Sequence, residues 1–390
     1  MKVTQYRTMR TRHEWGRPVG DANGVHADGV VDVDLVLVDT DEGITGVGMG
    51  PAVEVERIFA AIDGEDPRAT VALYDRMLRH AFKAGHSGVV FGTIGALDTA
   101  LWDIKAKAAG QPLWRLLGGR DRTLLAYGSA LDFGLPEAEL ADAYRAYAER
   151  GVRAAKLKGG LDVVSDLARL RIVHDVLAES TRGARPGLML DANENWSSKQ
   201  AVRYVSELER HLDLIWVEEP VRRWDAEGMA ALGRRIRASV AGGENLTGLE
   251  QFRPLLGAGA LDVVQTAAVW GITHFLRVAS LAHAYDRPVS PIGTTPTALL
   301  HAATAVPNHM VTELQDLTPP TGLTVDVTVA DGCFVLGDEP GIGVSVDVDA
   351  IAALGWAPAS MAAPARGPQI LSERAGRRLD TEIPPAESPG

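Results

Sequence analysis

The sequence predicts an α/β fold in which a parallel β/α barrel of the TIM type follows a smaller α+β domain. From residue 124 onward, short apolar runs alternate with amphipathic helical segments, the pattern of a parallel sheet. About eight such repeats close a barrel. The strands are expected at residues 124–129, 154–158, 188–191, 214–218, 239–243, 261–265, 288–291 and 310–313. Helices between them include residues 197–211, which Ser197 would cap.

The chain before residue 120 has a different pattern. The apolar runs 31–38 and 44–49 are separated by an Asp-Glu-Gly turn, which predicts a β-hairpin. Helical spacing of apolar residues follows, most clearly over residues 94–108. The predicted organisation comprises an α+β domain over 1–120, the barrel with its site over 121–320, a segment over 321–355 that returns to the first domain, and a disordered tail over 356–390.

The composition restricts the classes of function. The chain of 390 residues is 46% hydrophobic and 23% charged, values typical of a globular protein with a large core. A formal net charge of −12 argues against nucleic acid or an anionic membrane as a partner. The single cysteine, Cys333, excludes an intrachain disulfide and a multi-cysteine zinc site. Without an apolar leader or a membrane-length apolar run, the expected location is the cytoplasm.

Three carboxylates stand at the ends of consecutive predicted strands. They are Asp191, Glu218 and Glu244. A single acid of this kind is most simply a loop carboxylate or a helix cap. Three at equivalent strand ends would meet at one edge of the barrel, where they repel one another unless a cation or proton is shared. Oxygen ligands favour magnesium, or manganese, over zinc.

Two lysines on one strand complete this pattern. Lys156 and Lys158 are two residues apart and therefore point to the same face of the strand. Their apolar neighbours predict burial, and buried lysines imply a function or a carboxylate partner. A nearby divalent cation would lower a lysine pKa and make a neutral amine available as a base. The same cation would stabilise the enolate formed when a proton leaves the carbon beside a carboxylate.

Four further residues are candidates for binding a substrate. Asn193 and Asn245 closely follow metal-ligand candidates. His86 lies in a glycine-containing loop that could close over a ligand, although a surface turn is the simpler interpretation. Trp270 follows the sixth predicted strand, where pocket lining and core packing are equally supported.

At this point the chain resembles the enolase superfamily, in its mandelate racemase and muconate lactonizing enzyme branch. The matching motifs stand in order: the helix from Gly95 to Lys105 with its Leu-Leu-Gly-Gly ending, Lys-x-Lys, Asp-x-Asn, Glu-Glu-Pro and Gly-Glu-Asn. The resemblance implies an N-terminal capping domain and a modified (β/α)7β barrel. It implies one Mg²⁺ bound by Asp191, Glu218 and Glu244, with Lys158 as the base and Lys156 as its electrostatic partner. Substrate-selecting cap loops would lie near residues 16–26 and 82–88, and similar proteins are often homo-oligomers.

The departures from that family concern the opposite face of the barrel. Mandelate-racemase-like members carry an Asp–His pair from strands six and seven, but residues 262–268 hold no acid at the expected place, and residues 288–293 hold no histidine. A lysine on that face, as in the muconate-lactonizing group, is also absent. A one-base reaction such as syn elimination of water is therefore favoured over racemisation by two bases.

The leading hypothesis is a Mg²⁺-dependent lyase that dehydrates a small hydroxycarboxylic or sugar acid. An epimerase, racemase or cycloisomerase of a carboxylate is the first alternative. A metal-binding pseudoenzyme that lost turnover is the second, although retention of both lysines argues against it.

Overall fold

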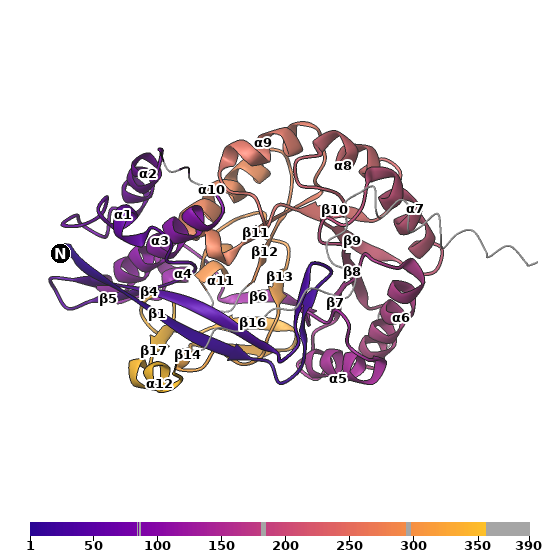
Figure 1. Cartoon of the computed structure of the whole chain (residues 1–390), viewed down its shortest axis with the longest axis horizontal. Coiled ribbons are helices and arrows are strands. Elements are labelled where there is room, and N and C mark those ends of the chain that lie inside the picture. The colour runs from indigo at the N-terminus through magenta and orange to yellow at the C-terminus, as the bar shows by residue number, and fades with distance from the viewer. Residues whose placement is uncertain (84, 86, 181–184, 294–297, 356–390) are drawn as a thin grey trace, which may run out of the picture.

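A parallel barrel forms the centre of the computed structural model, which describes residues 1–355 apart from 84, 86, 181–184 and 294–297 (Figure 1). Within these residues, the barrel strands are β6 (Thr123–Ser129), β7 (Ala154–Lys158), β8 (Gly187–Asp191), β9 (Leu214–Glu218), β10 (Ser239–Gly242), β11 (Val263–Ala267), β12 (Val289–Ile292) and β13 (Thr312–Leu314). Neighbouring strands from β6 to β12 pair in parallel, and β13 pairs in parallel with β6. A parallel bridge between Val289 and His309 completes the circle.

Helices connect the barrel strands and cover its outside (Figure 1). They are α5 (Glu137–Ala148), α6 (Val163–Ser180), α7 (Ser198–Leu208), α8 (Ala226–Gly233), α9 (Leu249–Gly257), α10 (Ile272–His283) and α11 (Ala298–Ala303). Ser197 caps α7 as expected, in a reciprocal capping box with Gln200. In the described chain no barrel helix follows β13, so the predicted (β/α)7β barrel is confirmed. None of the helices in this part of the chain is both long and apolar enough to cross a membrane.

The cap packs a three-stranded sheet against helices. Its sheet has the order β1 (Val3–Glu14), β4 (Val30–Thr40), β5 (Thr45–Met49), all antiparallel. Its helices are α1 (Val55–Phe59), α2 (Thr70–His80), α3 (Val89–Ala108) and α4 (Leu113–Leu116). A Cβ on Gly48 would lie 1.9 Å from the carbonyl oxygen of Ala96, so a glycine is required for β5 to approach α3 this closely.

Strand β1 is an element that the sequence analysis did not predict. Its side chains are largely polar, so the sequence has no apolar run here that predicts a strand. It pairs with β4 along nearly its whole length, and ion pairs such as Arg7–Asp39 at 3.0 Å connect the two strands. These charges face one another only after the strands have paired, so one sequence segment read by itself does not show them.

The chain after β13 runs back to the cap. It forms β14 (Leu323–Val325), β15 (Val327–Ala330), β16 (Cys333–Leu336), β17 (Val344–Val346) and α12 (Val348–Ala353). Strand β16 extends the barrel sheet antiparallel to β6, and Leu323 and Ile351 pack on Leu35 of the cap sheet. The predicted tail, residues 356–390, lies outside the described residues.

A buried carboxylate joins the cap to the barrel. Asp98 of α3 is fully buried and accepts hydrogen bonds from the backbone N–H and the hydroxyl of Thr273, at 2.7 and 2.6 Å, in the first turn of α10. Burial raises the pKa of Asp98 to about 7, although the hydrogen bonds from Thr273 oppose this shift. An aspartate in an unfolded chain titrates near pH 4, so the folded state holds the proton more tightly.

This shift predicts a pH-dependent contribution to stability. Because folding raises the pKa of Asp98, its contribution is most favourable below about pH 4 and is lost as the pH rises towards 7. An Asp98→Asn variant keeps the other titrating groups but cannot ionise here. The melting temperature of the variant, relative to that of the wild type, should therefore increase as the pH rises from about 4 to 7. A constant difference between the two proteins over that range would contradict this account.

Candidate active site

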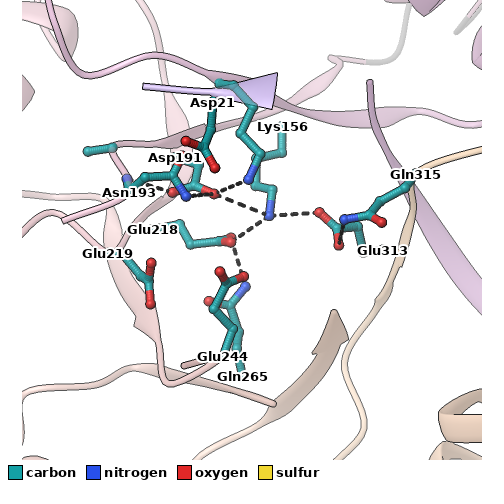
Figure 2. Close-up of polar contacts among 12 residues, drawn as sticks. Asp21, Lys156, Asp191, Asn193, Glu218, Glu219, Glu244, Gln265, Glu313 and Gln315 are labelled. Carbon is teal, nitrogen blue, oxygen red and sulfur yellow. Dashed lines mark hydrogen bonds and ion pairs between the residues drawn. The ribbon is translucent and has the colours of Figure 1, made fainter. Parts of the chain in front are cut away.

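The mouth of the barrel gathers the lysines and acids predicted from the sequence, of which Figure 2 labels Lys156 and the three acids. Lys158, Asp191 and Glu218 occupy matching positions at the ends of β7, β8 and β9, because the strand register pairs the first with the second and the second with the third. Glu244 follows the next strand, β10. Lys158, Asp191 and Glu218 are buried and Glu244 is partly buried, so their charges interact strongly.

Lys156 lies at the centre of the cluster (Figure 2). Its ammonium nitrogen is 2.5 Å from Glu218, 2.9 Å from Glu313 and 3.7 Å from Asp191. Burial opposes the charge, but the carboxylates of Glu218, Glu313 and Asp191 hold the pKa of Lys156 well above its usual value. Lys156 is therefore a fixed positive charge within the barrel.

Lys158 lies at the same mouth and contacts Asp191 at 2.5 Å. Its side chain is 5% exposed, whereas that of Lys156 is completely buried. Burial opposes the charge of Lys158, but Asp191 raises the pKa of its ammonium above the usual value, against the opposing effect of Lys156. Of the two lysines, Lys158 is the one whose amine borders the mouth.

The acids have unlike electrostatic environments. Burial disfavours the charge of Asp191, yet Lys158 and Lys156 hold its pKa below the usual value. Burial raises the pKa of Glu218 to about 8; Lys156 opposes this shift, and Asp191 and Glu244 reinforce it. One Glu218 oxygen also accepts hydrogen bonds from Gln265 at 2.7 Å and Trp216 at 3.1 Å.

These acids suit a hard divalent cation by their chemistry. Asp191, Glu218 and Glu244 offer only oxygen donors and repel one another, which a cation would relieve. Asn193 adds a buried amide oxygen that has no hydrogen-bond partner. Among the described residues, no three potential ligand side chains converge closely enough to hold a metal as they stand, and Asp191 and Glu218 are paired with the lysines.

Glu313 is a site residue that the sequence analysis missed. It lies on β13, faces Lys156 and accepts hydrogen bonds from the Gly293 N–H at 2.9 Å and the Gln315 amide at 3.0 Å. Burial alone would raise its pKa, but Lys156 and Lys158 lower it below the usual value. The signal was available, since residue 313 ends the eighth predicted strand just as the ligand candidates end theirs.

The four candidate substrate residues have different surroundings. Asn193 donates from its backbone and side chain to Asp191, and Asn245 donates to Glu244 and Glu219. The indole N–H of Trp270 donates to the Glu244 carbonyl, while its ring packs edge-on against Phe91 of the cap. His86 lies outside the described residues.

Two side chains near the mouth on the barrel wall opposite Lys158 are apolar. Strand β11 lies four places from β7 in the eight-stranded circle, directly across the barrel. Gln265 points inward to Glu218, so Ala267, two residues later, faces the same way. Ile292 belongs to the cluster that fills the barrel interior and pairs with Ala267 in the strand register. Where a second acid or base could stand, the chain therefore presents two hydrocarbon side chains.

A hairpin of the cap reaches the site. It is formed by β2 (Val19–Asp21) and β3 (Gly24–His26). The amide of Asn23 donates to the backbone carbonyl of Asn193 at 3.3 Å, and Figure 2 shows Asp21 beside the cluster. The sequence analysis placed a substrate-selecting loop in this segment, but it did not single out either side chain.

Comparison with known families agrees with this architecture. Residues 8–118 match the mandelate racemase / muconate lactonizing enzyme N-terminal domain, and residues 139–350 match the enolase C-terminal domain-like family. The chain therefore belongs to the enolase superfamily, in its mandelate racemase and muconate lactonizing enzyme branch, which confirms the resemblance inferred from the motifs.

Relatives with named activities cover most of the chain. A 3,6-anhydro-alpha-L-galactonate cycloisomerase of Streptomyces coelicolor is 30% identical over 83% of this chain and 92% of its own. An L-talarate/galactarate dehydratase of Salmonella typhimurium is 31% identical over 78% of this chain and 75% of its own. A structure of L-talarate dehydratase from Polaromonas sp. JS666, complexed with Mg and L-glucarate, has a TM-score of 0.80 at 29% identity, covering 93% of this chain and 99% of that one. The relatives are sugar acid dehydratases and cycloisomerases, and this chain is an enzyme.

Proposed function

We propose that the protein is a Mg²⁺-dependent hydro-lyase that removes the α-proton of a small hydroxycarboxylic or sugar acid and then releases water. The observation that carries this proposal is that both lysines lie on one side of the barrel. Lys158 borders the mouth on β7, whereas Ala267 and Ile292 face it across the barrel. A base on one face only is suited to syn elimination, because proton removal and leaving-group departure then share that face.

Lys158 is the proposed base, acting as the neutral amine. Although burial opposes the charge, contact with Asp191 raises the pKa of its ammonium, so the neutral form requires that a cation held by Asp191, Glu218 and Glu244 offset this effect. Of the two lysines, Lys158 is the one at the barrel mouth. In its neutral form, the amine can accept the proton from the substrate α-carbon. Lys156 is the proposed source of positive charge for the carboxylate that becomes an enolate, a role consistent with its three carboxylate neighbours. When bound by Asp191, Glu218 and Glu244, Mg²⁺ would supply further positive charge for that enolate.

The elimination balances with one acid-base group. Lys158 takes the α-proton and becomes an ammonium, and the electron pair of the broken C–H bond passes to the carboxylate, which becomes an enolate. That pair then returns to form the double bond between the α- and β-carbons as the β C–O bond breaks. The ammonium then gives its proton to the departing hydroxide on the same face, so water leaves and the amine is neutral again. Where the α-carbon also carries a hydroxyl, as in a sugar acid, the product of this step is an enol, which tautomerises to a 2-keto acid. No second acid on the opposite face is needed.

The substrate class is supported by the relatives. The L-talarate/galactarate dehydratase of Salmonella typhimurium carries a name consistent with loss of water from an acid. The Streptomyces coelicolor relative favours a second candidate, cycloisomerisation. There the leaving oxygen would stay attached to the substrate, so the same proton transfer would open or close a ring instead of releasing water.

Incubation with a library of acids in deuterium oxide tests the proposal. The full chain would be mixed with Mg²⁺ and sugar acids, hydroxy acids or N-acyl amino acids, and the products read by proton NMR and mass spectrometry. Loss of water from one acid, dependent on Mg²⁺, is the expected result. Isomerisation at constant mass would support the cycloisomerase instead. Inverted substrate carrying α-deuterium would point to an epimerase, and metal-dependent binding without turnover to a pseudoenzyme.

A further inference from the structure

Charged side chains bind the backbone of Lys158 beyond the end of the neighbouring strand β6. Strand β6 ends at Ser129, which pairs with Lys156, so the N–H and C=O of Lys158 have no partner on β6. Both groups would be unsatisfied inside the protein without other partners. The Lys158 N–H donates to the carboxylate of Asp132 at 3.2 Å, and its C=O accepts from the guanidinium of Arg169 at 2.8 Å.

Asp132 and Arg169 also bind each other. Their charged groups are 2.5 Å apart, and the guanidinium donates in addition to the Asp132 carbonyl at 2.8 Å. Asp132 is fully buried and the Arg169 side chain is 13% exposed. The hydroxyl of Tyr144 lies 2.9 Å from Asp132 and 2.6 Å from the carbonyl of Lys156, so the backbone of both lysines is tied to this group.

The same group contacts the cap hairpin. Leu131 has a left-handed backbone, with φ of 49°, and its carbonyl accepts a hydrogen bond from the Gly20 N–H at 2.8 Å. Gly20 also forms a parallel bridge with Asp132. In Figure 1 the indigo segment after β1 extends across the barrel to the region of β7. The hairpin that reaches Asn193 is therefore seated on the residues that hold Lys158.

We propose that the Asp132–Arg169 pair is a positioning device that fixes the backbone of Lys158 and links it to the seating of the cap hairpin. The pair does not touch the substrate. It acts by fixing the position of the Lys158 backbone and therefore the distance from the amine to the substrate α-carbon. Proton transfer is sensitive to this distance. This inference rests on the proposed function, in which Lys158 is the base.

The test compares Arg169→Met with a matched variant, Arg277→Met. Arg277 forms a similar two-pronged ion pair with Asp75, at 2.6 and 3.0 Å, between α10 and α2. In Arg169→Met, kcat for α-deuterium exchange should fall about 10- to 100-fold, with KM and Mg²⁺ affinity nearly unchanged. Arg169→Lys, which can keep one contact, should recover part of the loss. Arg277→Met should retain the wild-type kcat.

Amide hydrogen exchange gives a second readout that requires no substrate. Residues 19–26 should exchange faster in Arg169→Met and in the conservative Asp132→Asn variant, but not in Arg277→Met. If Arg169→Met matches Arg277→Met in both kcat and hairpin exchange, the proposal is wrong. If wild-type protein turns over no acid at all, the proposed function fails, and hairpin exchange alone then decides whether the link to the cap exists.

Discussion

Replacing Lys158 with alanine should reduce α-proton exchange by about 10²- to 10⁴-fold, the range expected when a general base is removed. The amine of Lys158 borders the barrel mouth, and the wall across from it, at Ala267 and Ile292, offers no titratable side chain to replace it. Exchange in deuterium oxide, followed by NMR on the acid that the library identifies, measures the effect.

Lys158→Arg separates basicity from charge. Arginine keeps the positive charge beside Asp191, but its guanidinium does not lose a proton at accessible pH. If Lys158 acts as a base, the arginine variant should be about as inactive as the alanine variant. Substantial exchange in Lys158→Arg would show that the residue contributes charge alone.

Replacing Glu244 with glutamine should weaken Mg²⁺ binding by at least about 10-fold and lower turnover in parallel at limiting metal. Glu244 makes the cleanest test of the proposed ligand set, because Asp191 and Glu218 also pair with the lysines, whereas the Glu244 carboxylate accepts a hydrogen bond from Asn245. Isothermal calorimetry measures the affinity, and chelation of the metal should abolish exchange by the wild type.

Glu219→Gln is the matched control for that variant. Glu219 is buried beside the same carboxylates, and burial together with Glu244 and Asp191 raises its pKa well above the usual value. A glutamine therefore resembles the neutral acid already favoured there, and Mg²⁺ affinity should change less than in Glu244→Gln. The opposite order would indicate that Glu219, not Glu244, ligates the metal.

The sequence was sufficient for the parts of the molecule that follow a local rule. Barrel strands are apolar and regularly spaced, and an acid at a strand end reaches the mouth whatever surrounds it. Asp191 and Glu218 were therefore predicted as neighbours, and the register places them side by side. Ser197 followed the local rule for a helix N-cap, and in the structure it caps the N-terminus of α7.

What the sequence could not predict depends on contacts between distant segments. Arg169 and Asp132 are 37 positions apart, and nothing local marks them as partners until β6 ends and leaves the Lys158 peptide without a strand neighbour. Strand β1 was missed for the same reason, because its arginines pair with aspartates of β4, a distant segment of the sequence. Glu313 differs, since the rule that identified the other acids also applied to it.

The configuration at the α-carbon of recovered substrate tests the one-base mechanism most directly. After partial reaction in deuterium oxide with Mg²⁺, unreacted acid would be isolated and examined by NMR for deuterium content and for the ratio of epimers. With Lys158 as the base and hydrocarbon at Ala267 and Ile292, any deuterium should enter with retention of configuration. Deuterium in the inverted epimer, formed at a rate comparable to turnover, would require a second acid-base group and contradict the account.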